Sequence, residues 1–188
     1  MRITRRLRLD VASSCAAMLL AGLCLSQPAP GAEPRSPDNQ YLDRLLGDWD
    51  MAGAVGAKPV RYHARGERVL GRGFLKLHMI DAATPPTYEA DLFLGVDATA
   101  GDYVAHWLDR FGAAGARVVA SGTRDGERLV LRFPYAEGAF RDTFTFDPGS
   151  GTWSLLLESQ APGGAWATFA RYTLVRTAGA VAPAGPAR

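Results

Sequence analysis

Tyr103, Trp107 and Asp109 recur at even spacing within the stretch 102–111. Successive side chains of a β-strand point to opposite faces, so these three would share one face of a strand. On an inward face the rings would offer apolar contact to a small molecule, and the carboxylate would orient it. Two other interpretations are favoured: Trp107 as a core residue, and Asp109 as the first residue of a turn.

A second carboxylate, Asp142, lies at alternate positions with Phe140, Phe144 and Phe146. An acid on so aromatic a face either pairs with a barrel arginine or contacts a ligand. The pair is favoured, with Arg132 or Arg171 as partner. The residues that we predict to bind a ligand are Tyr103, Trp107, Asp109, Phe140, Asp142, Phe144 and Arg171, with Leu92 and Leu155 as further lining.

Motifs for catalysis and metal binding are absent from the sequence. There is no G-x-S-x-G, H-E-x-x-H, P-loop or Gly-rich dinucleotide turn. A transition metal needs two or three convergent ligands, and strand alternation brings at most one or two of His63, His78 and His106 inside. We predict no metal and no cofactor, and we assign no catalytic residue. Acid–base chemistry by a shielded carboxylate stays an alternative.

Short apolar or alternating runs that could hold these residues follow one another along the chain. They are separated by turn signals such as Asp125-Gly126 and Gly163-Gly164. Short turns leave no room for helical crossovers, so the sheet is antiparallel, and closure removes its edges. The predicted fold is all-β, a single closed up-and-down barrel of about ten strands with a short N-terminal helix over 38–46. The predicted strands are 47–55, 59–70, 73–81, 88–97, 102–111, 117–123, 128–135, 139–147, 152–160 and 165–176.

Gly47-Asp48-Trp49 opens the first of these runs. In a closed antiparallel barrel the last strand can return beside the first, which brings the end of the chain's last strand to Trp49. An arginine there can stack on the indole ring and donate to nearby carbonyls. We therefore predict a structural role for Gly47, Trp49 and Arg176, with Arg171 as second choice for the arginine.

Several short motifs carry a resemblance to a known family: Gly47-x-Trp49, Leu94-Gly95-x-Asp97, Tyr103-x-x-x-Trp107-x-Asp109, Gly151-x-Trp153 and a last strand ending in Arg176. Over 41–176 the chain resembles a bacterial calycin-like family classified as domain of unknown function 1579. That family is related in shape to fatty-acid-binding proteins, lipocalins and nitrobindin-like haem proteins. The resemblance implies a meandering barrel of about ten strands and supplies no agreed activity. Nitrobindin-like proteins ligate haem through a histidine near the chain's end, and 166–176 has none, so we predict no haem.

The N-terminus has the pattern of an export signal. Four arginines precede an apolar run over 11–25 and a small-residue exit. We expect a signal peptide over 1–32, a linker over 33–40, the barrel over 41–176 and a disordered Ala/Pro/Gly tail over 177–188, in a periplasmic or secreted bacterial protein. Lipidation at Cys24 and an uncleaved anchor stay open.

Removing this segment changes the charge balance. The whole chain has 21 Lys+Arg and 19 Asp+Glu, whereas 33–188 holds 17 and 18. No basic surface indicates nucleic-acid binding, and we expect no stable membrane insertion after signal removal. Cys15 and Cys24 both lie in the signal, so the remainder has no thiol.

The function predicted from these observations is non-covalent binding of a small hydrophobic or amphipathic molecule inside the barrel. One alternative is an enzyme that uses cavity carboxylates for acid–base chemistry. Another is an envelope structural or partner-binding protein whose barrel is filled by side chains. Protein partners are unknown.

Overall fold

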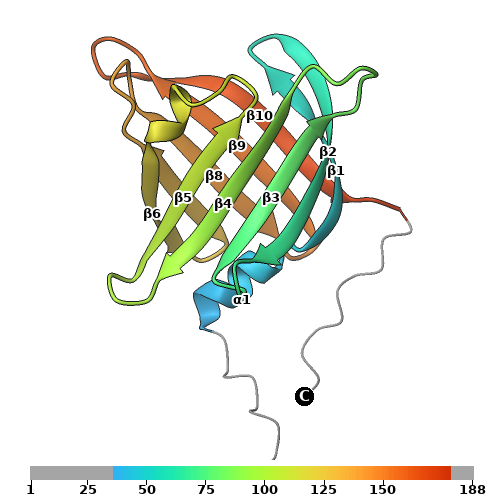
Figure 1. Cartoon of the computed structure of the whole chain (residues 1–188), viewed down its shortest axis with the longest axis vertical. Helices are drawn as coiled ribbons and strands as arrows, with labels where there is room; N and C mark the ends of the chain where they lie inside the picture. The colour runs from blue at the N-terminus through green and yellow to red at the C-terminus, as the bar shows by residue number, and fades with distance from the viewer. Residues whose placement is uncertain (1–35, 179–188) are drawn as a thin grey trace, which may run out of the picture. The chain divides into compact units, whose positions relative to one another are not determined.

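The computed structural model describes residues 36–178, which form a closed antiparallel barrel of ten strands. Each strand pairs with the next in sequence, and β10 returns to β1 (Figure 1). The predicted all-β barrel is confirmed. The strands are β1 (Gly47–Val55), β2 (Lys58–Val69), β3 (Phe74–Asp81), β4 (Glu89–Asp97), β5 (Asp102–Asp109), β6 (Val119–Asp125), β7 (Arg128–Phe133), β8 (Phe140–Asp147), β9 (Thr152–Gln160) and β10 (Trp166–Arg176).

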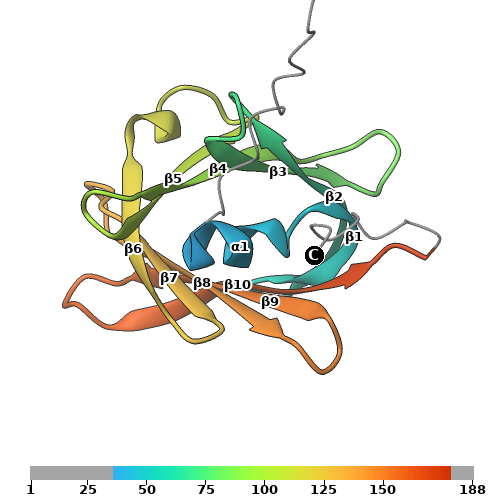
Figure 2. The ribbon, with the colours of Figure 1, turned by 90° about the horizontal axis from the view of Figure 1, so that it is seen from below.

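One short α-helix, α1 (Pro37–Asp43), precedes β1 and lies across one end of the barrel (Figure 2). It is therefore not at the chain's terminus, and it begins inside the stretch 33–40 that we expected to be linker. Ser36 caps it, with its side chain accepting from the Asn39 N–H, and Pro37 occupies the first turn. Tyr41, Leu42 and Leu45 from the helix and the residues after it are buried in the barrel core.

The barrel closes where β10 returns to β1. Trp49 is opposite Arg176 in the strand register, and the Arg176 guanidinium lies 4.3 Å from the centre of the indole ring. Arg176 also donates to the carbonyls of Leu46 (2.9 Å) and Arg44 (3.3 Å), and the indole N–H donates to the Leu45 carbonyl (2.8 Å). The predicted contact between Trp49 and Arg176 is confirmed, and it ties the chain segment after α1 to the barrel seam.

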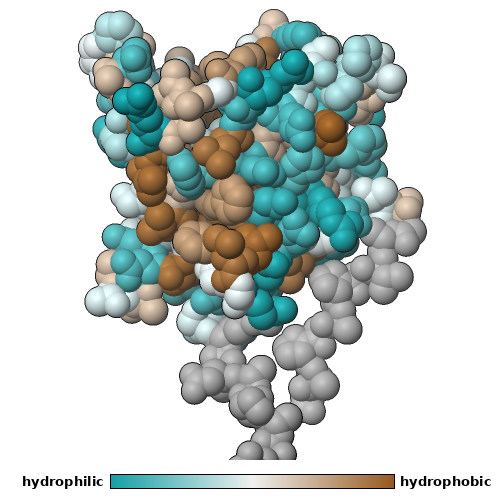
Figure 3. All heavy atoms as spheres, viewed as in Figure 1, coloured by the Kyte–Doolittle hydropathy of each residue, from teal (hydrophilic) through white to brown (hydrophobic). Residues whose placement is uncertain are grey.

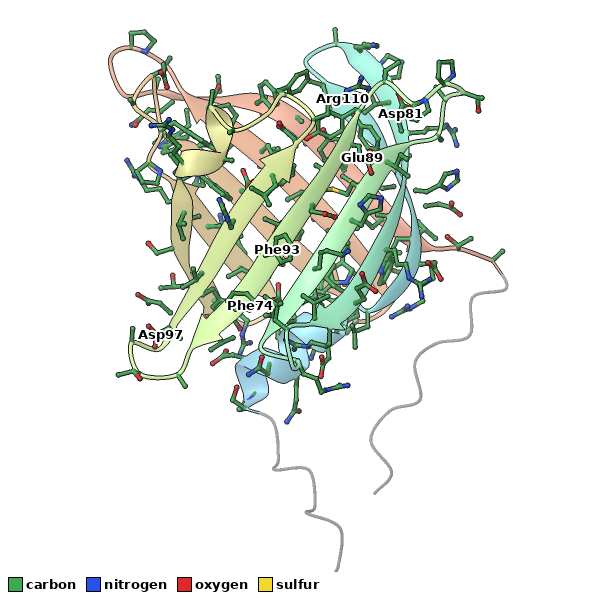
Figure 4. All side chains as sticks on the ribbon, in the orientation of Figure 1. Phe74, Asp81, Glu89, Phe93, Asp97 and Arg110 are labelled. Carbon is green, nitrogen blue, oxygen red and sulfur yellow. The ribbon has the colours of Figure 1, made fainter. Side chains whose placement is uncertain are left out.

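The wall has an apolar outer patch as well as an apolar interior. Figure 3 shows apolar residues gathered on the outer surface over β4 and β5. Phe74 and Phe93 lie on this outer face (Figure 4). A Cβ atom on Gly95 would come within 2.8 Å of the Phe74 ring, so the glycine leaves the space that this ring occupies. The outer patch lies on the other side of the wall from the interior.

The interior is divided along the barrel axis. Next to α1 it is filled by large buried side chains such as Trp49, Trp153, Phe144 and Tyr103. The other half holds a cavity. No helix among residues 36–178 is long and apolar enough to span a membrane. The expected signal peptide over 1–32, with its two cysteines, and residues 179–188 of the expected tail lie outside the described residues.

Candidate ligand-binding site

The cavity has a volume of about 1340 Å³ and lies at the barrel end opposite α1. Its wall comes from the turn between β1 and β2, the ends of β3, β5, β7 and β9, and the starts of β8 and β10. Asp81, at the rim, and Arg110 mark this end of the barrel in Figure 4, and Asp97 marks the opposite end. Because α1 covers the other opening, this end is the route into the interior.

Three tyrosines form one side of the cavity wall. Tyr62 lies between Tyr88 and Tyr172, with ring centres 5.6 and 5.8 Å from its own. Burial raises the pKa of all three phenols, so they stay neutral donors at physiological pH.

Aromatic contacts continue around the rest of the cavity. The Trp107 indole N–H donates to the Tyr88 hydroxyl at 3.2 Å, which fixes both rings at the wall. On the other side, Tyr135 stacks on Phe133 and meets Phe140 edge to face. Phe169 continues the series against Phe140 at 5.2 Å, next to a β-bulge between Thr168 and Ala170. A β-bulge redirects side chains locally, and Phe169 lines the cavity.

Asp142 is a buried acidic residue, with 2% of its surface exposed. It lies on β8 opposite Leu131 and Leu157 and lines the cavity. Its Oδ1 atom has no hydrogen-bond partner. Burial raises the pKa of this carboxyl from 3.8 to about 8, so at neutral pH the carboxyl is mostly protonated.

Asp109 serves two purposes at the end of β5. Its carboxylate accepts from the Phe111 N–H at 3.0 Å, the contact expected of an aspartate that begins a turn. It also lines the cavity. Asp109 therefore both begins the turn and forms part of the cavity wall.

The predicted site residues separate into two groups. Trp107, Asp109, Phe140 and Asp142 all line the cavity. Tyr103 and Phe144 point inward but lie in the filled half: the Tyr103 hydroxyl donates to Asp38 of α1 at 2.8 Å, and the Phe144 ring packs on Trp153. Leu92 and Leu155 are fully buried in the same core and do not line the cavity.

Arg171 is the exception among the predicted residues, because its side chain is exposed on β10 between the inward-facing Ala170 and Tyr172. Neither Arg171 nor Arg132 pairs with Asp142. Arg132 lies 5.5 Å from the Trp166 ring. The favoured arginine pair is therefore wrong, and Asp142 faces the cavity without a cation.

Sequence reasoning missed all four tyrosines that line the cavity: Tyr62, Tyr88, Tyr135 and Tyr172. Tyr62 and Tyr172 share inward faces with Ala64 and with Ala170 and Leu174, so alternation could have found them. Tyr88 and Tyr135 are end residues of the predicted strands 88–97 and 128–135, on the same faces as Leu92 and Leu131, and they lie just outside β4 and β7 in the structure. Alternation could therefore have turned them inward as well, but it does not show that they reach the cavity.

The histidines lie on the outer side of the wall or at its surface. His78 contacts Asp91 at 2.8 Å, and His106 contacts the Ala116 carbonyl at 2.6 Å. His63 is exposed near Asp50. Within 36–178, no cluster of three or more His, Cys, Asp or Glu side chains has the arrangement of a metal site.

Comparison with known proteins supports the fold. No family model matches the sequence, and neither does any curated protein. Among solved structures, the chain is similar to the crystal structure of Rv2717c from M. tuberculosis, with 21% sequence identity and a TM-score of 0.53. The match covers 77% of this chain and 99% of that one. At this identity the likeness establishes a shared barrel architecture.

Proposed function

We propose that this barrel binds a small hydrophobic or amphipathic molecule non-covalently in its open half. The observation that carries the proposal is the cavity of about 1340 Å³, lined by aromatic rings and containing the unpartnered Asp142 carboxyl. A concave, mainly apolar site with a few polar groups is the usual form of a small-molecule site. Each 100 Å² of ligand apolar surface removed from water contributes about 2.5 kcal/mol.

Dye binding tests this proposal. An environment-sensitive apolar dye should bind the folded protein and quench Trp107, whose ring lines the cavity. Trp107→Ala should weaken dye binding, whereas His63→Ala, which removes a ring from the outer face, should leave it unchanged. A wild type that binds no dye, or two variants that both bind like wild type, would contradict the proposal and favour a structural or partner-binding role.

A second candidate function is acid–base catalysis on a molecule held in the same cavity. The observation that favours it is Asp142, whose pKa of about 8 lies near physiological pH, as suits a general acid or base. Turnover of a bound compound that disappears in Asp142→Asn while binding persists would favour the enzyme. Binding with recovery of the unchanged compound favours the carrier.

Export and family membership belong to the same proposal. The Arg-rich start and apolar run of 1–32 support a periplasmic or secreted protein. The Trp49 and Arg176 closure supports kinship with the calycin-like family of domain 1579. Mass spectrometry of the protein from its native envelope should show a chain that begins after Ser26. An intact Met1 or a lipidated Cys24 would overturn this part.

A further inference from the structure

We propose that the ligand is an organic cation, whose ammonium group lies against the Asp142 carboxylate inside a cage of aromatic rings. This inference rests on the proposed function and narrows it to one charge class. It follows from which charges line the cavity, from the rings around them and from the absence of an internal partner for Asp142.

Asp142 lies within electrostatic reach of three of the wall tyrosines. Its charge contributes to the raised pKa of Tyr88, Tyr135 and Tyr172. These tyrosines come from three parts of the barrel: the segment before β4, the segment after β7, and β10. Asp142, Tyr88, Tyr135 and Tyr172 all line the same cavity, so a ligand that reaches the carboxyl shares its site with these rings.

No basic side chain opposes this carboxyl within the cavity. The cations among the lining residues are Lys58 and Arg61, both exposed at the start of β2. The arginine nearest in sequence, Arg141, points to the other face of β8 and is bonded to Glu158 at 2.8 Å. A ligand carboxylate or sulfate would therefore meet an acid in the interior and no arginine to pair with.

The surrounding chemistry favours a cation over a neutral molecule. The faces of tyrosine and tryptophan rings attract cations, most strongly when water is excluded, and cages of such rings recognise quaternary ammonium groups. An ionised carboxylate in the same place adds a direct charge partner. The ligand would thus supply the charge partner that the Asp142 carboxyl lacks in the protein itself.

Protonation couples to this binding. The Asp142 carboxyl keeps its proton up to about pH 8, and a bound ammonium group favours its ionised form, so binding releases a proton. Below pH 8 the apparent affinity for a permanent cation should fall by up to about ten-fold per pH unit. The other titratable or charged groups that line the cavity are Lys58, Arg61, Tyr62, Asp81, Tyr88, Asp109, Tyr135, Glu137 and Tyr172.

The test compares three probes that share one chain and differ in head group: decyltrimethylammonium, decanol and decyl sulfate, each as monomers. Calorimetry on the wild-type protein at pH 8 should show decyltrimethylammonium binding at least ten-fold more tightly than the other two. Equal or weaker binding of the cation would overturn the inference, although the proposed function would stand. Failure of all three to bind would remove the proposed function itself.

The variant Asp142→Asn tests whether the preference for the cationic probe depends on the Asp142 carboxylate. The amide resembles the protonated carboxyl in size and charge, so the variant should fold, which circular dichroism checks. It should bind decanol within two-fold of wild type and lose the preference for the cation. Asp50→Asn, an exposed change on β1, should retain it. Should Asp142→Asn keep the full preference, the assignment to Asp142 is wrong; if the variant does not fold, the wild-type probe series alone decides.

Discussion

At the scale of single residues, the molecule places its unusual chemistry at Asp142. Most buried carboxyls in proteins have a cation or several donors to offset desolvation. Here burial alone raises the pKa to about 8. The folded protein thus carries a proton that the unfolded chain releases near pH 4.

This difference predicts a pH dependence of stability. Between about pH 4 and pH 8 the folded state holds one proton more than the unfolded state, so the free energy of unfolding falls as pH rises, by up to about 1.4 kcal/mol per unit. Asp142→Asn removes this contribution, and its stability relative to wild type should grow from pH 5 to pH 8. Urea unfolding at each pH measures it. Asp50→Asn should run parallel to wild type, and parallel curves for Asp142→Asn would contradict the prediction.

Trp49 stabilises the barrel where β10 pairs with β1. It is 1% exposed and bonded to the Leu45 carbonyl, with Arg176 stacked on its ring. Trp49→Ala should lower the free energy of unfolding by about 3–5 kcal/mol. Trp166→Ala, at a half-buried ring, should cost less than half as much. Denaturant unfolding compares the two, and similar losses would show that closure does not depend on Trp49.

At the scale of elements, α1 is attached to the barrel by a polar cluster as well as by its apolar side chains. Asp38 accepts from Arg124 of β6 at 2.9 Å and from the Tyr103 hydroxyl at 2.8 Å. The Arg124 guanidinium also lies 5.1 Å from the Tyr41 ring. The cluster joins the first turn of the helix to β5 and β6.

Loss of this cluster should loosen the helix. Asp38→Ala removes the carboxylate that accepts from both Arg124 and the Tyr103 hydroxyl, at a cost of about 1–3 kcal/mol. Hydrogen exchange should show faster exchange of the amides in α1, while those of β8 and β9 keep their protection. Unchanged exchange in α1 would indicate that Leu42 and Leu45 hold the helix without help.

Gly66 on β2 allows the chain between α1 and β1 to lie close to the wall. A Cβ atom at this position would lie 2.0 Å from the Leu45 carbonyl oxygen, a backbone atom that cannot move alone. Gly66→Ala should therefore destabilise the protein by more than about 2 kcal/mol. Gly115→Ala is the control, since a Cβ atom there meets nothing within 4 Å. Thermal unfolding should separate them clearly, and equal midpoints would rule out the close approach.

The sequence predicts the elements far better than the cavity. Alternation and turn residues locate all ten strands to within two residues, because every connection between consecutive strands contains Gly or Pro. Alternation also turns Tyr103 and Phe144 inward, which is correct, but it carries no information about position along the barrel axis. Whether an inward residue meets core or cavity depends on how far α1 fills the interior. The predicted ion pair between Asp142 and Arg171 is wrong for a different reason: Asp142 faces the interior, whereas the Arg171 side chain lies on the outer face of the wall.

At the scale of the whole molecule, ligand and fold should stabilise each other. A compound that binds only the folded barrel raises the free energy of unfolding by about 2.7 kcal/mol when present at one hundred times its dissociation constant. Decyltrimethylammonium at that excess should raise the unfolding midpoint of wild type, with a much smaller shift for Asp142→Asn. Calorimetric scanning at pH 8 measures both, and equal shifts would mean that the cation binds elsewhere.

Because α1 covers one end of the barrel, a ligand has a single route into and out of the interior. With that end stopped, whatever enters the open half must leave by the way it came, and the part that enters last faces solvent at the mouth. A ligand whose ammonium group leads toward Asp142 would have the end of its tail nearest the mouth. A compound attached to a bead by the end of its tail should then still bind the protein. Beads that carry different amines in this way should retain the protein according to how well each ammonium group fits the site.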